Sequence, residues 1–102
     1  MTPDPCDPIV VTGGGGFLGQ HVVKTLWASG YRSVIVPRRA ACDLRDGVVV
    51  RQLLALTRPK AIIHLAAAVG GIGANQDNPA TFFYDNAIMG LQLMEEARRI
   101  GV

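Results

Sequence analysis

The first half of the chain alternates short runs of β-branched residues with a longer amphipathic stretch. Residues 9–11 (IVV) form a β-branched run of the kind found in buried strands. Between residues 17 and 27 the apolar side chains recur at helical spacing, and Gly30 lies where such a helix would end. Residues 33–36 (SVIV) then predict a second strand, which Pro37 closes. The pattern over these residues is strand, helix, strand.

The middle of the chain holds one ambiguous segment and one clear strand. Asp46 is placed to cap a helix that ends before Pro59 and carries three leucines, Leu53, Leu54 and Leu56. The run VVV at residues 48–50 favours a strand by propensity alone, so the two signals compete there. Residues 61–67 (AIIHLAA) are a short apolar run, and they predict a buried parallel strand.

A long amphipathic helix is predicted for the last part of the sequence. Residues 69–78 (VGGIGANQDN) are expected to form the loop that leads into it. Asn78 fits the N-cap and Pro79 the first helical position, and Gly101 ends the helix. We expect one apolar stripe of this helix to join the core, formed by Tyr84, Ala87, Ile88, Leu91 and Met94.

Alternating strands and helices predict an α/β fold, with a parallel sheet and helices packed on its faces. Residues 41–44 (ACDL) do not fit this alternation simply. Too few residues separate them from the strand at 33–36 for a helical crossover between parallel strands. We therefore expect residues 41–44 to form a short edge segment.

Composition and charge narrow the class of protein. The 102 residues are 49% hydrophobic and 18% charged, which suits one small globular domain. A net charge of +2 without a Lys/Arg run argues against a nucleic-acid partner, and the longest apolar stretch is far short of the roughly 20 residues of a membrane span. The lead-in at residues 1–8 is polar, interrupted by proline and unlike a signal peptide, so the folded domain is expected over 9–102. Cys6 and Cys42 have no metal-type spacing and are interpreted as free thiols of a cytoplasmic protein.

The glycine-rich segment TGGGGFLG at residues 12–19 is the strongest chemical signal. It follows a predicted strand and opens a predicted helix, which is the position of a dinucleotide fingerprint and not of a flexible linker. It fits both G-x-G-x-x-G and T-G-x-x-G-x-x-G, the latter framed by Gly13, Gly16 and Gly19. Gly13 would make the turn out of the strand and Gly16 would admit a pyrophosphate to the helix N-terminus. Gly19 would let the helix pack closely.

The end of the second predicted strand indicates which dinucleotide is bound. A site for NAD places an acidic residue about 20 residues after the glycines, where it binds the ribose hydroxyls. Here that position reads VPRR at residues 36–39 and contains no acid. The guanidinium groups of Arg38 and Arg39 suit a 2′-phosphate by charge and geometry, so we predict NADP with one of them on the phosphate. The alternative is two solvated arginines at a strand end.

Several motifs together resemble the extended short-chain dehydrogenase/reductase family. Its nucleotide loop reads T-G-x-x-G-F-[IL]-G, and this chain has Phe17 and Leu18 before the last glycine. HLAAAV at residues 64–69 is similar to the family's fourth strand, which ends over the cofactor, and Asp43-Leu44 is similar to its pair near the adenine. The resemblance implies a Rossmann-type doubly wound parallel sheet, of which this chain is the N-terminal part, and cofactor contacts from Phe17, Leu18, Asp43, Leu44, Leu65, Ala66 and Ala67.

A more specific likeness lies in VGGIGANQDNPATFFYDN at residues 69–86. It resembles the V-G-G-I-x-A-N-x-x-x-P-x-x-F stretch of GDP-fucose synthases, which are NADPH-dependent GDP-4-keto-6-deoxymannose epimerase/reductases. This implies a nucleotide-sugar substrate, a homodimer for the full-length protein, and a position beside the nicotinamide and sugar for Gly70 and Gly71. The alternatives are a UDP-sugar epimerase, a nucleotide-sugar dehydratase or a non-catalytic NADP-binding module.

The catalytic residues of the resembled family are not expected within this sequence. Its Tyr-x-x-x-Lys motif does not occur, because Tyr31 is followed four residues later by Ile35 and Tyr84 by Ile88. We therefore expect part of a longer enzyme, without turnover of its own. His64 is expected to be a buried, hydrogen-bonded structural residue. Two further assignments stay open: Asp43 as a simple loop acid, and Asn86 as a polar residue on the exposed side of its helix.

Overall fold

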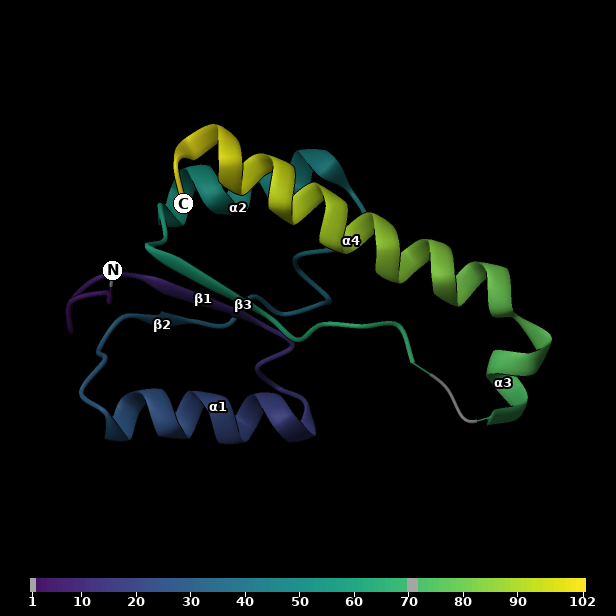
Figure 1. The fold of residues 1–102 in the computed structure, drawn as a ribbon, viewed down its shortest axis with the longest axis horizontal. Coiled ribbons are helices and arrows are strands. Elements are labelled where there is room, and N and C mark those ends of the chain that lie inside the picture. Colours follow the sequence, from purple (N-terminus) through teal and green to yellow (C-terminus); the bar gives the residue numbers. More distant parts are fainter. Residues whose placement is uncertain (1, 70–71) are drawn as a thin grey trace.

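Three parallel strands form a single sheet in the computed structural model, which describes residues 2–69 and 72–102 (Figure 1). The strands are β1 (Ile9–Thr12), β2 (Val34–Ile35) and β3 (Ala61–His64), in the order β2-β1-β3. Ile9 lies opposite Val34 on one side and Ala61 on the other. The crossover from β2 to β3 therefore passes over β1, as the predicted α/β fold requires.

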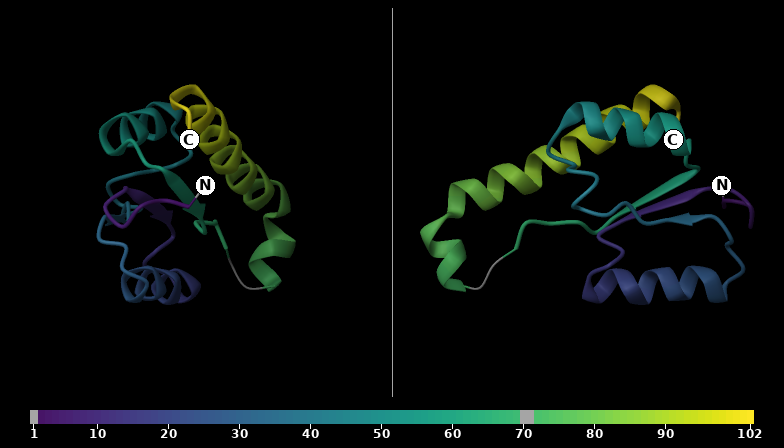
Figure 2. Two further views of the ribbon diagram at one scale, coloured as in Figure 1. Left: turned by 60° about the vertical axis from the view of Figure 1, so that its left-hand side comes forward. Right: turned by 180° about the vertical axis from the view of Figure 1, so that it is seen from behind.

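The helices cover both faces of this sheet. Helix α1 (Phe17–Ala28) lies on one face, and α2 (Gly47–Thr57) and α4 (Pro79–Ile100) lie together on the other, as Figure 2 shows. A short helix, α3 (Ile72–Asp77), precedes α4, and both α3 and the first half of α4 extend beyond the sheet (Figure 1). None of the helices within the described ranges is long and apolar enough to cross a membrane.

Two separate hydrophobic clusters follow from the alternation of side chains along the strands. On the α1 face, Ile9 and Val11 of the central strand pack with Val23 of the helix. On the other face, Val50 and Leu54 of α2 pack with buried residues of α4 and of the 41–46 turn, and the cluster comprises Leu44, Val50, Leu54, Met89 and Leu93. Burial on both faces explains why β1 contains only apolar residues and Thr12.

The ambiguous segment at residues 48–50 is helical. The Asp46 carboxylate accepts a hydrogen bond from the Val48 backbone N–H at 3.0 Å and caps α2, as predicted. Val50 and Leu54 lie one turn apart and are almost fully buried. Capping and tertiary burial therefore outweigh the strand propensity of three consecutive valines.

Four expectations need correction. Residues 41–44 join no strand; they lie in an irregular segment between two turns, which places Leu44 in the core, 5% exposed. Residues 72–77, expected as loop, form α3, while residues 70 and 71 lie outside the described part. Residues 61–67 were expected to form a buried strand, but β3 covers only Ala61–His64 and is half-buried to exposed, because it is an edge strand. In the stripe expected in the core, Tyr84, Leu91 and Met94 are 63%, 58% and 65% exposed, and Ala87 and Ile88 are half-buried.

Candidate functional site

A pocket of about 360 Å³ lies beyond the carboxyl ends of the three strands. Every loop that leaves the sheet at this end contributes to its wall: residues 12–16 after β1, 36–39 after β2 and 65–68 after β3. The turn at residues 42–45 and Met89 of α4 complete the lining. Ligands of open parallel sheets bind at this edge, where connections from a central strand diverge to the two sides.

The glycine loop is shaped by close approach of backbone segments. Gly13 has φ +71°, and a Cβ there would lie 2.7 Å from the backbone N of Ala66. Gly19 is buried, and a Cβ there would overlap the carbonyl oxygen of Gly13. Only glycine therefore satisfies both the left-handed turn at Gly13 and the packing of α1 against this loop. These two positions take the structural roles predicted from the sequence.

Thr12 joins the glycine loop to the segment after β3. Its side chain is fully buried, and its Oγ1 accepts hydrogen bonds from the backbone N–H groups of Leu65 at 3.1 Å and Ala66 at 3.2 Å. Oγ1 also lies 2.6 Å from Nδ1 of His64. With two donors already pointing at the hydroxyl oxygen, its own proton is directed to Nδ1, which makes His64 the neutral Nε2–H tautomer.

His64 was expected to be buried, and this is wrong, because it ends an edge strand and is exposed. The expected hydrogen bond is present, to Thr12. Partial desolvation of the ring lowers the pKa of His64 below its usual value.

Arg38 and Arg39 follow β2 and line the same pocket as the glycine loop. Both side chains are exposed, and neither forms a salt bridge with any residue of the described ranges. The nearest heavy atom to a Cβ built on Gly15 is Nη1 of Arg38, at 3.9 Å. The pocket therefore presents positive charge next to the helix N-terminus that the glycines form.

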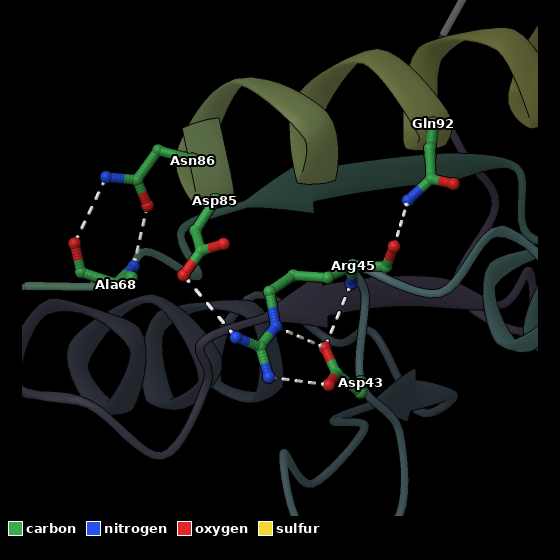
Figure 3. A network of polar contacts seen from close by, with 6 residues as sticks. All are labelled: Asp43, Arg45, Ala68, Asp85, Asn86 and Gln92. Atoms are coloured by element: carbon green, nitrogen blue, oxygen red, sulfur yellow. Dashed lines mark hydrogen bonds and ion pairs between the residues drawn. The ribbon is translucent and has the colours of Figure 1, made fainter. Parts of the chain in front are cut away.

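Asp43 and Arg45 form a closely bonded pair that also lines the pocket (Figure 3). Arg45 donates from Nη2 to one carboxylate oxygen of Asp43 at 2.8 Å, and from Nε and its backbone N–H to the other at 3.0 Å each. These hydrogen bonds lower the pKa of Asp43 to about 2. Nη1 of Arg45 also lies 3.4 Å from the Asp85 carboxylate on α4. Asp43 is thus an acid on the pocket wall that is paired with Arg45.

Two amide side chains of α4 hold the pocket walls, and sequence reasoning did not assign them this role. Asn86 is half-buried and bonds both ways to the backbone of Ala68, accepting from its N–H at 2.6 Å and donating to its carbonyl at 3.1 Å (Figure 3). Gln92 donates to the carbonyls of Leu44 at 3.0 Å and Arg45 at 2.9 Å. The open alternative for Asn86 is therefore settled, because its side chain faces inward.

The remaining predicted contacts divide by position. Leu44, Leu65, Ala66 and Ala67 line the pocket together with Gly13 and Gly16. Phe17 and Leu18 begin α1 with exposed side chains that do not line it, and the Phe17 ring packs edge-on against His21. Any contact from these two residues would come from their backbone N–H groups. Gly19 lies behind the loop, where it supports the loop's backbone.

The described side chains show no metal site. Among residues 2–69 and 72–102, no group of three or more His, Cys, Asp or Glu residues is placed to hold an ion. Cys42 lines the pocket, but burial, and to a smaller extent the charge of Asp43, raise the pKa of its thiol. A thiol that is protonated at neutral pH is a poor nucleophile. The arrangement is suited to binding an anionic ligand by backbone and guanidinium groups.

The fold and the pocket define a Rossmann-like nucleotide-binding unit, and comparison with known proteins gives the family. A model of the NAD dependent epimerase/dehydratase family matches residues 9–102, and the chain belongs to this family. It is 40% identical over 94 residues to a GDP-L-fucose synthase of Sinorhizobium fredii, which covers 92% of this chain and 30% of that protein.

Solved structures agree with this assignment. The GDP-L-fucose synthetase of Naegleria fowleri bound to NADP superposes with a TM-score of 0.85 at 31% identity, covering 100% of this chain and 31% of that one. The UDP-glucose 4-epimerase of Thermus thermophilus in complex with NAD gives 0.81 at 32% identity, covering 93% and 35%. The resemblance to the extended dehydrogenase/reductase family and to GDP-fucose synthases is thereby confirmed, and the chain spans about a third of the length of these relatives.

Proposed function

We propose that this chain forms the dinucleotide-binding part of an NADP-dependent nucleotide-sugar epimerase/reductase similar to GDP-fucose synthases. The observation that carries the proposal is one pocket lined by a glycine loop at a helix N-terminus and by Arg38 and Arg39. The helix end suits the pyrophosphate, and the arginines suit the 2′-phosphate that distinguishes NADP from NAD. When bound, the cofactor supplies hydride chemistry at its nicotinamide.

The residues of the loop fit such a ligand. Packing within the protein does not require glycine at position 15, since a Cβ there would meet no heavy atom closer than 3.9 Å. Gly16 is the N-cap of α1 and provides no side-chain cap, so the N–H groups of the first turn stay available to a phosphate oxygen. A loop that carries glycine where the fold has room for a side chain is explained by a ligand that must approach its backbone.

The other walls supply the rest of the site. The family likeness assigns Asp43 and Leu44 to the adenine end of the cofactor, and both residues line the pocket. Leu65, Ala66 and Ala67 line the same pocket as the glycine loop. The loop that the sequence likeness associates with the nicotinamide and sugar includes residues 70 and 71, outside the described part. The nucleotide sugar itself is therefore proposed from the family likeness, with GDP-4-keto-6-deoxymannose as the substrate class.

The cofactor assignment is tested by comparing the affinities of the purified 102-residue chain for NADPH and NADH. We expect NADPH to bind more tightly by roughly 10- to 100-fold, the range given by one or two charge-assisted hydrogen bonds. The double variant Arg38→Ala/Arg39→Ala should lose this preference. Arg32→Ala is the matched control, because Arg32 is exposed and does not line the pocket. An unchanged preference in the double variant would refute the role of the arginines.

A UDP-sugar epimerase is the second candidate, favoured by the likeness to the NAD complex from Thermus thermophilus. It predicts equal or tighter binding of NADH, so the same titration separates the two candidates. A coupled assay with GDP-4-keto-6-deoxymannose tests the substrate class in the longer protein that the proposal implies. The 102-residue chain should bind NADPH without oxidising it, because it contains no Tyr-x-x-x-Lys motif.

A further inference from the structure

The turn at residues 43–46 forms the pocket wall without belonging to the sheet. Within it, the backbone N–H of Asp46 donates to the carbonyl of Asp43 at 3.0 Å. The next two carbonyls, of Leu44 and Arg45, receive no bond from the strands of the described residues, which are β1, β2 and β3. Their partner is the side-chain amide of Gln92, 47 to 48 residues further along the chain.

Gln92 holds this turn with one functional group. Its Nε2 donates one hydrogen to Leu44 O at 3.0 Å and the other to Arg45 O at 2.9 Å, so both amide hydrogens are used. The residue opposite the amide oxygen is Gly47, where a Cβ would lie 2.5 Å from Oε1 of Gln92. The absence of a side chain at Gly47 therefore makes room for the amide. Figure 3 shows Gln92 reaching down from α4 to the turn.

Neighbouring residues of α4 fix the same turn through other atoms. Met89 and Leu93 enclose the Leu44 side chain in the core, and Asp85 accepts a hydrogen bond from the Arg45 guanidinium at 3.4 Å. The guanidinium in turn holds the Asp43 carboxylate by two side-chain hydrogen bonds. Gln92 holds the backbone of Leu44 and Arg45. The positions of Asp43 and Leu44 on the pocket wall therefore depend on Gln92.

We propose that Gln92 is a positioning residue for the adenosine end of the dinucleotide, acting by holding the backbone of residues 44 and 45. This rests on the function proposed above, which places the adenosine between the arginines after β2 and the turn at Asp43. Gln92 does not line the pocket and touches no ligand; it acts through the turn. Residues 65–68, which lead into the loop that the sequence likeness associates with the nicotinamide, are held separately by Thr12 and Asn86.

The test uses two halves of the cofactor. Adenosine 2′,5′-bisphosphate probes the adenosine end, and reduced nicotinamide mononucleotide probes the other. Gln92→Leu removes both donors and should weaken binding of the bisphosphate about 10-fold, which corresponds to about 1.4 kcal/mol and is within the range expected for losing two hydrogen bonds. Binding of the mononucleotide should change by less than about twofold, because Gln92 shares no hydrogen bond with the described residues 65–68 and distant sites act independently. Gln52→Leu is the matched control, since Gln52 is exposed on α2 and outside the pocket.

A second readout is independent of any ligand. Amide hydrogen exchange of Arg45 and Asp46 should accelerate in the Gln92→Leu chain, while exchange in β1 stays unchanged. If Gln92→Leu does not fold, Gln92→Glu keeps the length of the side chain, removes the donors and should show the same pattern. If the role of Gln92 were purely structural, the variant would bind both cofactor halves equally more weakly, or bind both with unchanged affinity. Either result would overturn the proposal.

The outcomes separate this inference from the function on which it rests. Failure of the folded wild-type chain to bind NADPH overturns the proposed function, and the positioning role with it. Normal NADPH binding, with unchanged affinity of Gln92→Leu for adenosine 2′,5′-bisphosphate, overturns the positioning role alone. Unaltered amide exchange at Arg45 and Asp46 in the variant also overturns it, whatever binds.

Discussion

The tight turn at Gly13 gives a prediction whose magnitude can be worked out from the structure. Replacing Gly13 by alanine adds a Cβ at φ +71°, 2.7 Å from both the Ala66 nitrogen and the Leu65 carbonyl carbon. The left-handed backbone costs a residue with a Cβ about 1 to 2 kcal/mol. Forcing an extra carbon against backbone atoms costs a further 1 to 3 kcal/mol or so. The free energy of unfolding of Gly13→Ala should therefore fall by roughly 2 to 5 kcal/mol.

Gly30 provides the control that separates these two costs. Its φ is +93°, but a Cβ there would meet nothing within 4 Å. Gly30→Ala should therefore show only the conformational cost, about 1 to 2 kcal/mol. Asparagine tolerates positive φ better than alanine while carrying the same Cβ. Gly30→Asn should be close to neutral, whereas Gly13→Asn should keep the contact cost of about 1 to 3 kcal/mol.

Urea unfolding followed by far-ultraviolet circular dichroism measures all four variants on one scale. The informative quantity is the difference between equivalent substitutions at positions 13 and 30, since the conformational cost largely cancels in it. Equal losses at the two positions would refute the reasoning. They would mean that the segment Leu65–Ala66 does not approach the glycine loop as closely as the structure shows.

Three further predictions concern hydrogen-bonded polar side chains. Thr12→Val leaves the Ala66 N–H without its acceptor and should reduce the free energy of unfolding by about 1 to 3 kcal/mol in urea titrations. Thr12→Ser keeps the hydroxyl and should largely retain the wild-type stability. Asp46→Ala removes the cap of α2 and should cost about 1 kcal/mol by the same measurement. The lowered pKa of His64 means that the unfolded chain binds a proton that the folded chain resists, so stability should fall as the pH drops below about 6.5. In His64→Gln, the free energy of unfolding should depend less on pH between pH 7 and pH 5 than in the wild-type chain. An unchanged pH dependence would contradict the assignment.

The sequence predicted the elements that local rules specify. The β-branched run of β1, the proline and glycine boundaries and the Asp46 cap each act over a few residues, and each appears where predicted. The glycine loop was also found, because its strand–loop–helix context is local. Residues 41–44 were misjudged, since the burial of Leu44 depends on a helix that begins 35 residues later. No local pattern contains that contact.

The candidate site shows the same division. The predicted pocket residues come from loops directly after strands, and the parallel sheet brings those loops to one edge whatever the details of packing. The residues that hold the loops were missed or left open. Asn86 and Gln92 are polar residues in an amphipathic helix, and such residues are usually solvated. Their targets, backbone groups of Ala68 and Leu44, lie 18 and 48 residues away.

The misplaced stripe of α4 and these polar contacts have a single cause. The inward face carries Asn86, Met89, Leu93 and Glu96, which follow helical spacing but mix apolar and polar side chains. The expected stripe begins at Tyr84, two residues earlier, which is about 200° around the helix. A hydropathy pattern counts Asn86 and Glu96 as surface and so selects the opposite face. In the observed rotation, α4 packs Met89 and Leu93 against α2, and its Asn86 and Gln92 side chains bond to the backbone around the pocket. The buried face of this helix therefore combines hydrophobic burial with polar contacts that a hydropathy pattern does not count.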